Sequence, residues 1–140
     1  MLNDDELRRI YAESKVIAVV GMSADPYKPS HSIPRYLQSC GYRVIPVTPK
    51  GGEILGERAY TSLEEIDGVD IDVVDVFRPA EEAPDIARSA VAIGADVLWL
   101  QAGISSDEAE RIAQEGGLRV VMDACMGATH ARLGLGPGPH

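Results

Sequence analysis

Cysteine, lysine and histidine, three residues that often carry chemistry, are scarce in this sequence of 140 residues. Its two cysteines, Cys40 and Cys125, exclude a disulfide framework and a four-cysteine zinc site. The three histidines are widely separated and stand near no cysteine or carboxylate cluster, so we expect no metal site. Lys15, Lys28 and Lys50 are the only lysines, so any place where two of them meet is informative.

Long apolar runs and an excess of positive charge are missing as well. No run approaches the ~20 residues of a membrane span. The amino-terminal stretch MLNDDELRRIYAES is acidic and has no apolar centre, so we expect no secretory signal and a cytoplasmic location. The formal net charge of −9 repels phosphates and argues against a protein that coats nucleic acid. A phosphate-bearing ligand would therefore need local positive groups.

Short apolar runs alternate with helix-like segments along the chain. The runs are continuously apolar, which is typical of strands buried on both faces, and they cover residues 16–20, 44–47, 73–77, 97–100 and 120–122. Helices are predicted at about 4–12, 32–40, 62–66 and 81–93, and from a capping box at 105–108 to the glycines at 116–117.

This alternation predicts an α/β fold, with a doubly wound parallel sheet of about five strands between two layers of helices. One domain should cover residues 1–133, and the glycine- and proline-rich tail, residues 134–140, is predicted to be disordered. In such sheets, ligands bind at the carboxyl ends of the strands, where the strand order reverses. The candidate functional residues are therefore those that follow each apolar run.

The loop after the first run has the position of a phosphate loop, but it holds one glycine where the dinucleotide fingerprint has three. Gly21 would allow a close backbone approach, and Lys28 adds a charge. Ser30 to Ser32 would present hydroxyls and amides at a helix start, where anions are favoured. The alternative is an ordinary polar loop whose serines only cap the helix.

The second run is followed by Pro49 and Lys50, where a NAD-binding domain has an acidic residue for the ribose diol. Alone, Lys50 could be a solvated loop charge. Together with Lys28 in an acidic, lysine-poor chain, it indicates a ligand with a phosphate on its ribose.

Later loops offer further candidates. Phe77 could pack in the core or form a wall for an adenine ring, and Arg78 could close that wall or pair with Glu81 or Glu82. Gln101 and Gly103 stand at another helix start, where a short polar turn is an equally good interpretation.

The residues Asp123, Cys125 and His130 could suggest a thiol nucleophile with a base. Their spacing does not ensure contact and no oxyanion donor is identifiable, so we expect no catalytic residues. His130 is expected in or near the loose tail. Asp75 should be structural, accepting hydrogen bonds from loop amides.

Several stretches resemble, in order and spacing, the small bacterial coenzyme A-binding protein family. They include VGMSADPYKPSHSIPRYL, VIPVTPKGG, DVVDVFRPAEE, LWLQAGI and GLRVVMDACM, and the resemblance covers about residues 5–130. The sequence is more distantly similar to the amino-terminal domain of the succinyl-CoA synthetase alpha subunit.

The resemblance implies a Rossmann-like domain that binds coenzyme A, or an acyl-CoA, without catalysis of its own. It places Gly21, Met22 and Ser23 against the ligand backbone, Lys28, Ser30 and His31 at the phosphates, Pro49 and Lys50 at the phosphorylated ribose, Phe77 and Arg78 at the adenine, and Gln101 and Gly103 at the pantetheine arm. The alternative function is an NADP-binding or acyl-CoA-handling enzyme.

Overall fold

Five parallel strands in the order β2-β1-β5-β6-β7 form the central sheet of the computed structural model, which describes residues 2–137. The predicted α/β fold is confirmed, and the strand order reverses between β1 and β5. The strands are β1 (Val16–Val20), β2 (Arg43–Val47), β5 (Val73–Val76), β6 (Val97–Leu100) and β7 (Arg119–Val121).

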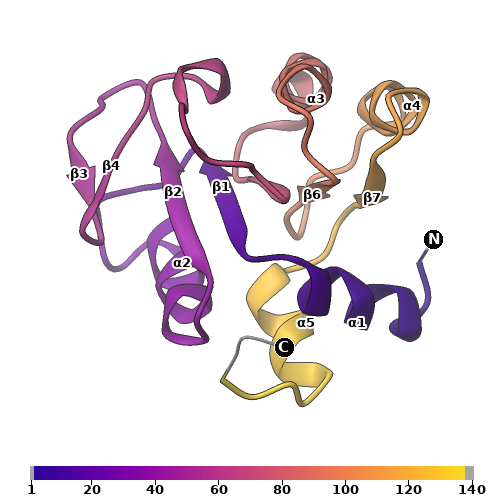
Figure 1. The fold of residues 1–140 in the computed structure, drawn as a ribbon, viewed down its shortest axis with the longest axis horizontal. Helices are drawn as coiled ribbons and strands as arrows, with labels where there is room; N and C mark the ends of the chain where they lie inside the picture. Colours follow the sequence, from indigo (N-terminus) through magenta and orange to yellow (C-terminus); the bar gives the residue numbers. More distant parts are fainter. Residues whose placement is uncertain (1, 138–140) are drawn as a thin grey trace.

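Helices cover both faces of the sheet (Figure 1). One face carries α3 (Ala83–Ala92) and α4 (Asp107–Glu115), and the other carries α1 (Asp4–Glu13), α2 (Pro29–Ser39) and α5 (Met126–Arg132). Successive strand residues point to opposite faces, and both are covered, which explains why the strand sequences are continuously apolar. Among the described residues, no helix has the length and apolarity to cross a membrane.

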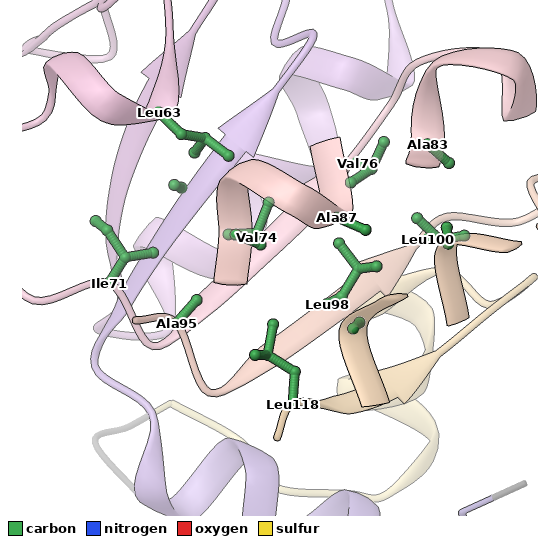
Figure 2. Close-up of a cluster of buried hydrophobic side chains, with 14 of the residues drawn as sticks. Leu63, Ile71, Val74, Val76, Ala83, Ala87, Ala95, Leu98, Leu100 and Leu118 are labelled. Atoms are coloured by element: carbon green, nitrogen blue, oxygen red, sulfur yellow. The ribbon is translucent and has the colours of Figure 1, made fainter. Parts of the chain in front are cut away.

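Alanines bring α3 and α4 close to the sheet. Figure 2 shows Val74, Val76, Leu98 and Leu100 of β5 and β6 pointing toward the helix layer that carries Ala83 and Ala87. The opposite core is built from larger side chains, with Trp99 and Tyr11 fully buried and their rings 5.8 Å apart. Small side chains of the helices thus pack one face of the sheet, and large aromatic side chains pack the other.

Two elements were not predicted from the sequence. The first is a hairpin of β3 (Glu53–Ile54) and β4 (Glu57–Arg58), whose turn residues Leu55 and Gly56 both have positive φ, at 53° and 79°. Such a turn favours Asn-Gly or Asp-Gly, so Leu-Gly gives a weak signal. The second is α5, which is too short for clear periodicity.

Several predicted boundaries differ from the observed ones. The helix predicted at 32–40 begins at Pro29, because proline is preorganised for the first helical position. The segment at 62–66 is a single 3₁₀ turn, η1 (Leu63–Glu65), and the one at 81–93 begins with a second, η2 (Ala80–Glu82). α4 is capped by Ser106, whose hydroxyl accepts from the Ala109 amide at 3.1 Å.

The prediction for His130 was wrong. It is fully buried in α5 and its Nδ1 lies 2.9 Å from the Tyr36 hydroxyl, so the chain is packed well beyond the last strand. In the tail predicted as disordered, the half-buried Leu135 packs against the core on the sheet face that carries α1, α2 and α5, which we call the α1–α2–α5 core. Residues 138–140 lie outside the described part.

Replacing Leu98 by alanine tests the α3–α4 core. Leu98 is fully buried, so Leu98→Ala should lower the free energy of unfolding by about 2–5 kcal/mol, measured by urea denaturation. Ile112→Ala, a partly buried position on the same cluster, is the control and should lose less. Equal losses at the two positions would contradict this description of the core.

Candidate functional site

A cleft of about 580 Å³ opens at the carboxyl ends of β1, β2 and β5. It lies where the strand order reverses, the place at which doubly wound sheets bind ligands. Residues of three loops and of the hairpin line it: Gly21, Met22, Ser23, Ala24, Asp25, Lys28, Thr48, Pro49, Lys50, Gly51, Gly52, Glu53, Ile54 and Arg78. Seven of the twelve predicted site residues are in this set.

Gly21 is required by close packing at the end of β1. Its φ is 86°, and a Cβ built on it would lie 2.7 Å from Cδ of Arg78 and 2.9 Å from the carbonyl oxygen of Phe77. A side chain would therefore clash with the backbone of the neighbouring strand end. The single glycine of this loop sets the distance between β1 and the residues that follow β5.

The loop that follows Gly21 is held by its own hydrogen bonds. The Ser23 amide donates to the Ser30 carbonyl at 3.2 Å, and the Tyr27 amide donates to the Asp25 carboxylate at 3.0 Å. Lys28 is the N-cap residue of α2 and its side chain makes no capping hydrogen bond. The Lys28 ammonium is thus available to the cleft.

The predicted phosphate contacts Ser30 and His31 lie inside α2 and do not line the cleft. The idea that the loop serines cap the helix is wrong, because the helix begins before them. His31 is buried, and its Nδ1 lies 2.8 Å from the Ser23 carbonyl oxygen. In this structure the imidazole supports the loop.

The second loop and the hairpin form the opposite wall. The Thr48 amide donates to the Tyr60 carbonyl at 2.8 Å, which fixes the loop where β2 ends. Glu53 and Ile54 of β3 also line the cleft, and Gln38 of α2 holds the hairpin turn by donating to the Leu55 carbonyl at 3.0 Å. Sequence reasoning predicted Pro49 and Lys50 of this wall but missed the hairpin, because a two-residue strand carries no periodicity.

The lining of the cleft carries the cations Lys28, Lys50 and Arg78 and the carboxylates Asp25 and Glu53. Lys28 and Lys50 are both exposed on it, and neither forms an ion pair with any residue that the structure describes. Arg78 also lines it but is paired with Glu82, with Nη2 2.7 Å from Oε2. Positive charge that is not neutralised by a partner attracts anions, so the cleft is suited to a phosphorylated ligand.

Phe77, Gln101 and Gly103 lie outside the cleft lining. Phe77 is half-buried and packs against the α1–α2–α5 core. Gln101 is buried and its side chain bridges two elements: it donates to Asp75 and accepts from the Met126 amide at 3.3 Å. Their contact with a ligand stays a prediction.

Asp75 is a fully buried carboxyl in the middle of the sheet. One of its oxygens accepts from Gln101, and Oδ2 has no hydrogen-bond partner among the described residues. Burial raises the pKa of Asp75 to about 7, against the opposing effect of hydrogen bonds from Gln101 and from the Val76 backbone. The Asp75 carboxyl therefore loses its proton near neutral pH.

The residues weighed as a thiol site have separate partners. Asp123 accepts from the Gly103 amide at 2.6 Å, Cys125 Sγ accepts from the Ala128 amide at 3.4 Å, and His130 pairs with Tyr36. Each side chain has a structural role that accounts for it. In the described part of the chain, no cluster of three or more histidine, cysteine or acidic residues could hold a metal ion.

Comparison with known proteins gives consistent results. A family model described as "CoA binding domain" matches residues 15–131. The uncharacterized protein YneT of Bacillus subtilis is 43% identical over 126 residues, covering 90% of this chain and 93% of YneT. A solved structure from Thermus thermophilus is similar with a TM-score of 0.89 and 42% identity, covering 94% of this chain and 99% of the other.

A longer relative matches over part of its length. The alpha subunit of the ADP-forming acetate–CoA ligase II of Pyrococcus furiosus is 30% identical over 129 residues, which are 84% of this chain and 28% of the subunit. The chain thus corresponds to about a quarter of that ligase subunit.

The raised pKa of Asp75 predicts a pH-dependent stability. The Asp75 carboxyl keeps its proton up to about pH 7 in the folded chain but only up to about pH 3.8 in the unfolded chain. The stability that the protonated carboxyl contributes is therefore lost as the pH rises from the lower of these values through the higher one. Asp75→Asn should therefore stabilise the chain at pH 8 by about 2–4 kcal/mol, since one pKa unit corresponds to about 1.4 kcal/mol. At pH 4 the gain should nearly vanish.

Urea denaturation of both chains at several pH values measures this difference. Because the remaining titratable groups are common to the two chains, their effects cancel to first order. A difference that stays constant from pH 4 to pH 8 would show that the ionisation of Asp75 is not coupled to folding.

Proposed function

The chain belongs to the family of CoA binding domains, and we propose that it binds coenzyme A, free or acylated, in the cleft at the carboxyl ends of β1, β2 and β5. The observation that carries the proposal is the position of Lys28 and Lys50, two of only three lysines, on one cleft, where neither forms an ion pair with a described residue. Coenzyme A has a ribose phosphate and a diphosphate, so it offers an anion to each lysine.

The two walls of the cleft suggest which anion each lysine binds. Lys50 and Pro49 follow β2, where dinucleotide-binding folds hold the ribose, so we assign them to the ribose phosphate. Lys28 precedes α2 and faces the loop of Gly21 to Ser23, where such folds hold a diphosphate. Ser30 and His31 support this loop through Ser23, and their contact with the phosphates stays a proposal.

The other predicted contacts extend the ligand along the sheet edge. We assign Arg78 and Phe77 to the adenine, and Gln101 and Gly103 to the pantetheine arm. Because the Gln101 side chain is occupied by Asp75 and the Met126 amide, and its own amide donates to the Val76 carbonyl, its contact with the arm would fall to the carbonyl oxygen, which already accepts from the Ile104 amide. The described side chains that line the cleft form no acid–base pair with one another, and we propose binding without catalysis.

Calorimetric titration with coenzyme A, NADP and NAD in one buffer tests the ligand. NADP also has a phosphorylated ribose, and NAD lacks that phosphate, so the three ligands separate recognition of the phosphate from recognition of the whole molecule. We expect binding heat with coenzyme A and little or none with the other two. A preference for NADP would replace this proposal with an NADP-binding function.

Reversing the charge of Lys50 tests the ribose phosphate contact. Lys50→Glu should weaken coenzyme A by about tenfold or more, because a favourable contact becomes a repulsion, and should weaken dephospho-coenzyme A by about threefold or less. The control is Lys15→Glu, the same charge change just before β1, at the opposite edge of the sheet. Equal losses for both ligands would show that Lys50 does not contact that phosphate.

A further inference from the structure

The third cation of the cleft, Arg78, differs from the two lysines because it is fixed by a carboxylate. Its Nη2 lies 2.7 Å from Oε2 of Glu82 and its Nε lies 3.2 Å from Oε1, so the two side chains meet through two parallel hydrogen bonds. This forked geometry is the strongest that arginine forms with a carboxylate, and it fixes the plane of the guanidinium. Glu81, the other acidic neighbour, forms no ion pair with any residue in the described part of the chain.

The backbone holds Glu82 at this position. Pro79 starts the 3₁₀ turn η2, and the Glu82 amide donates to the Pro79 carbonyl at 2.9 Å. Glu82 is also the N-cap residue of α3, so the start of a ten-residue helix fixes its backbone. The carboxylate is therefore presented to Arg78 from a rigid turn at the cleft rim.

The stem of Arg78 lies on the loop after β1. Its Cγ and Cδ pass within 3.1 and 2.7 Å of the position that a Cβ on Gly21 would occupy. The aliphatic part of the Arg78 side chain lies against Gly21 and the guanidinium is bonded to Glu82, so the side chain is held at both ends. A guanidinium held in this way keeps a flat face, which stacks well on aromatic rings.

The Arg78–Glu82 ion pair also determines which cations of the cleft keep their charge. Glu82 neutralises Arg78, whereas Lys28 and Lys50 have no ion-pair partner among the described residues. Two groups thus retain their charge for phosphates, and the third offers a surface with little net charge. A base needs such a surface more than it needs a cation.

We propose that Glu82 is a positioning residue that holds Arg78 as a flat stacking surface for the adenine base, while Lys28 and Lys50 supply the charge that binds the phosphates. This role rests on the proposed function, since it assumes that a nucleotide occupies the cleft. In this proposal, the preference for adenine depends on Glu82, a residue that lies outside the cleft lining.

Two nucleotides of equal charge separate stacking from phosphate binding: adenosine 3′,5′-bisphosphate and uridine 3′,5′-bisphosphate. The native chain should prefer the adenosine compound, because a purine has the larger stacking face. Glu82→Gln, which frees Arg78, and Arg78→Lys, which keeps the charge but removes the flat group, should each reduce that preference by about fivefold or more. The ratio of affinities for coenzyme A and dephospho-coenzyme A should change by less than about twofold, since Lys50 is intact.

The matched control is Glu115→Gln, because Glu115 pairs with Arg111 at the same i,i+4 spacing on α4 but away from the cleft. It should leave the base preference unchanged. The salt dependence of binding provides a second measurement: freeing the Arg78 charge should steepen it in Glu82→Gln, which loss of a purely structural contact would not do.

Two results would overturn the role of Glu82 while leaving the proposed function intact. One is a native chain that binds coenzyme A and keeps its base preference in both variants. The other is a Glu82→Gln variant that binds both bisphosphates more tightly with its base preference unchanged, which would make Glu82 a competitor of the ligand for Arg78. A native chain that binds no coenzyme A would instead overturn the proposed function, and this role with it.

Discussion

The close contact between the end of β1 and the end of β5 is the constraint on which the candidate site depends. Strand β1 is held from both sides there, because the Gly21 amide donates to the Val47 carbonyl and the Val20 carbonyl accepts from the Phe77 amide, each at 2.9 Å. Only a residue without a side chain fits between these neighbours. The loops after β1 and β2 and the residue Arg78 are thereby brought to one edge of the sheet, where the cleft opens.

Among the buried side chains of the five described strands, Asp75 is the polar one, and it begins a chain of hydrogen-bonded polar groups. Asp75 is bound to Gln101, Gln101 to the Met126 amide, and the Met126 carbonyl accepts from the Tyr11 hydroxyl at 2.6 Å. This chain joins β5 and β6 to α5 and α1. It costs stability, because it buries a carboxyl with one unpaired oxygen, but it fixes how α5 and α1 sit on the sheet.

The electrostatics of the chain separate the cleft from the rest of the surface. A net charge of −9 repels anions in general, and most arginines near acidic residues are neutralised by them. Lys28 and Lys50 have no ion-pair partner among the described residues, so the cleft keeps positive charge that can attract anions.

The residue pattern was enough to predict the strands, most helices and the edge of the sheet where the loops meet. Continuous apolar runs require burial on both faces, and parallel strands place Lys28 and Lys50 at the same edge whatever the details of packing. Three features could be seen only in the folded chain: the β3–β4 hairpin, the buried position of His130 and the pairing of Arg78 with Glu82 and not with Glu81. These features depend on contacts between residues far apart in the chain, or on where a single helical turn begins. Such causes leave no periodic signal in the sequence.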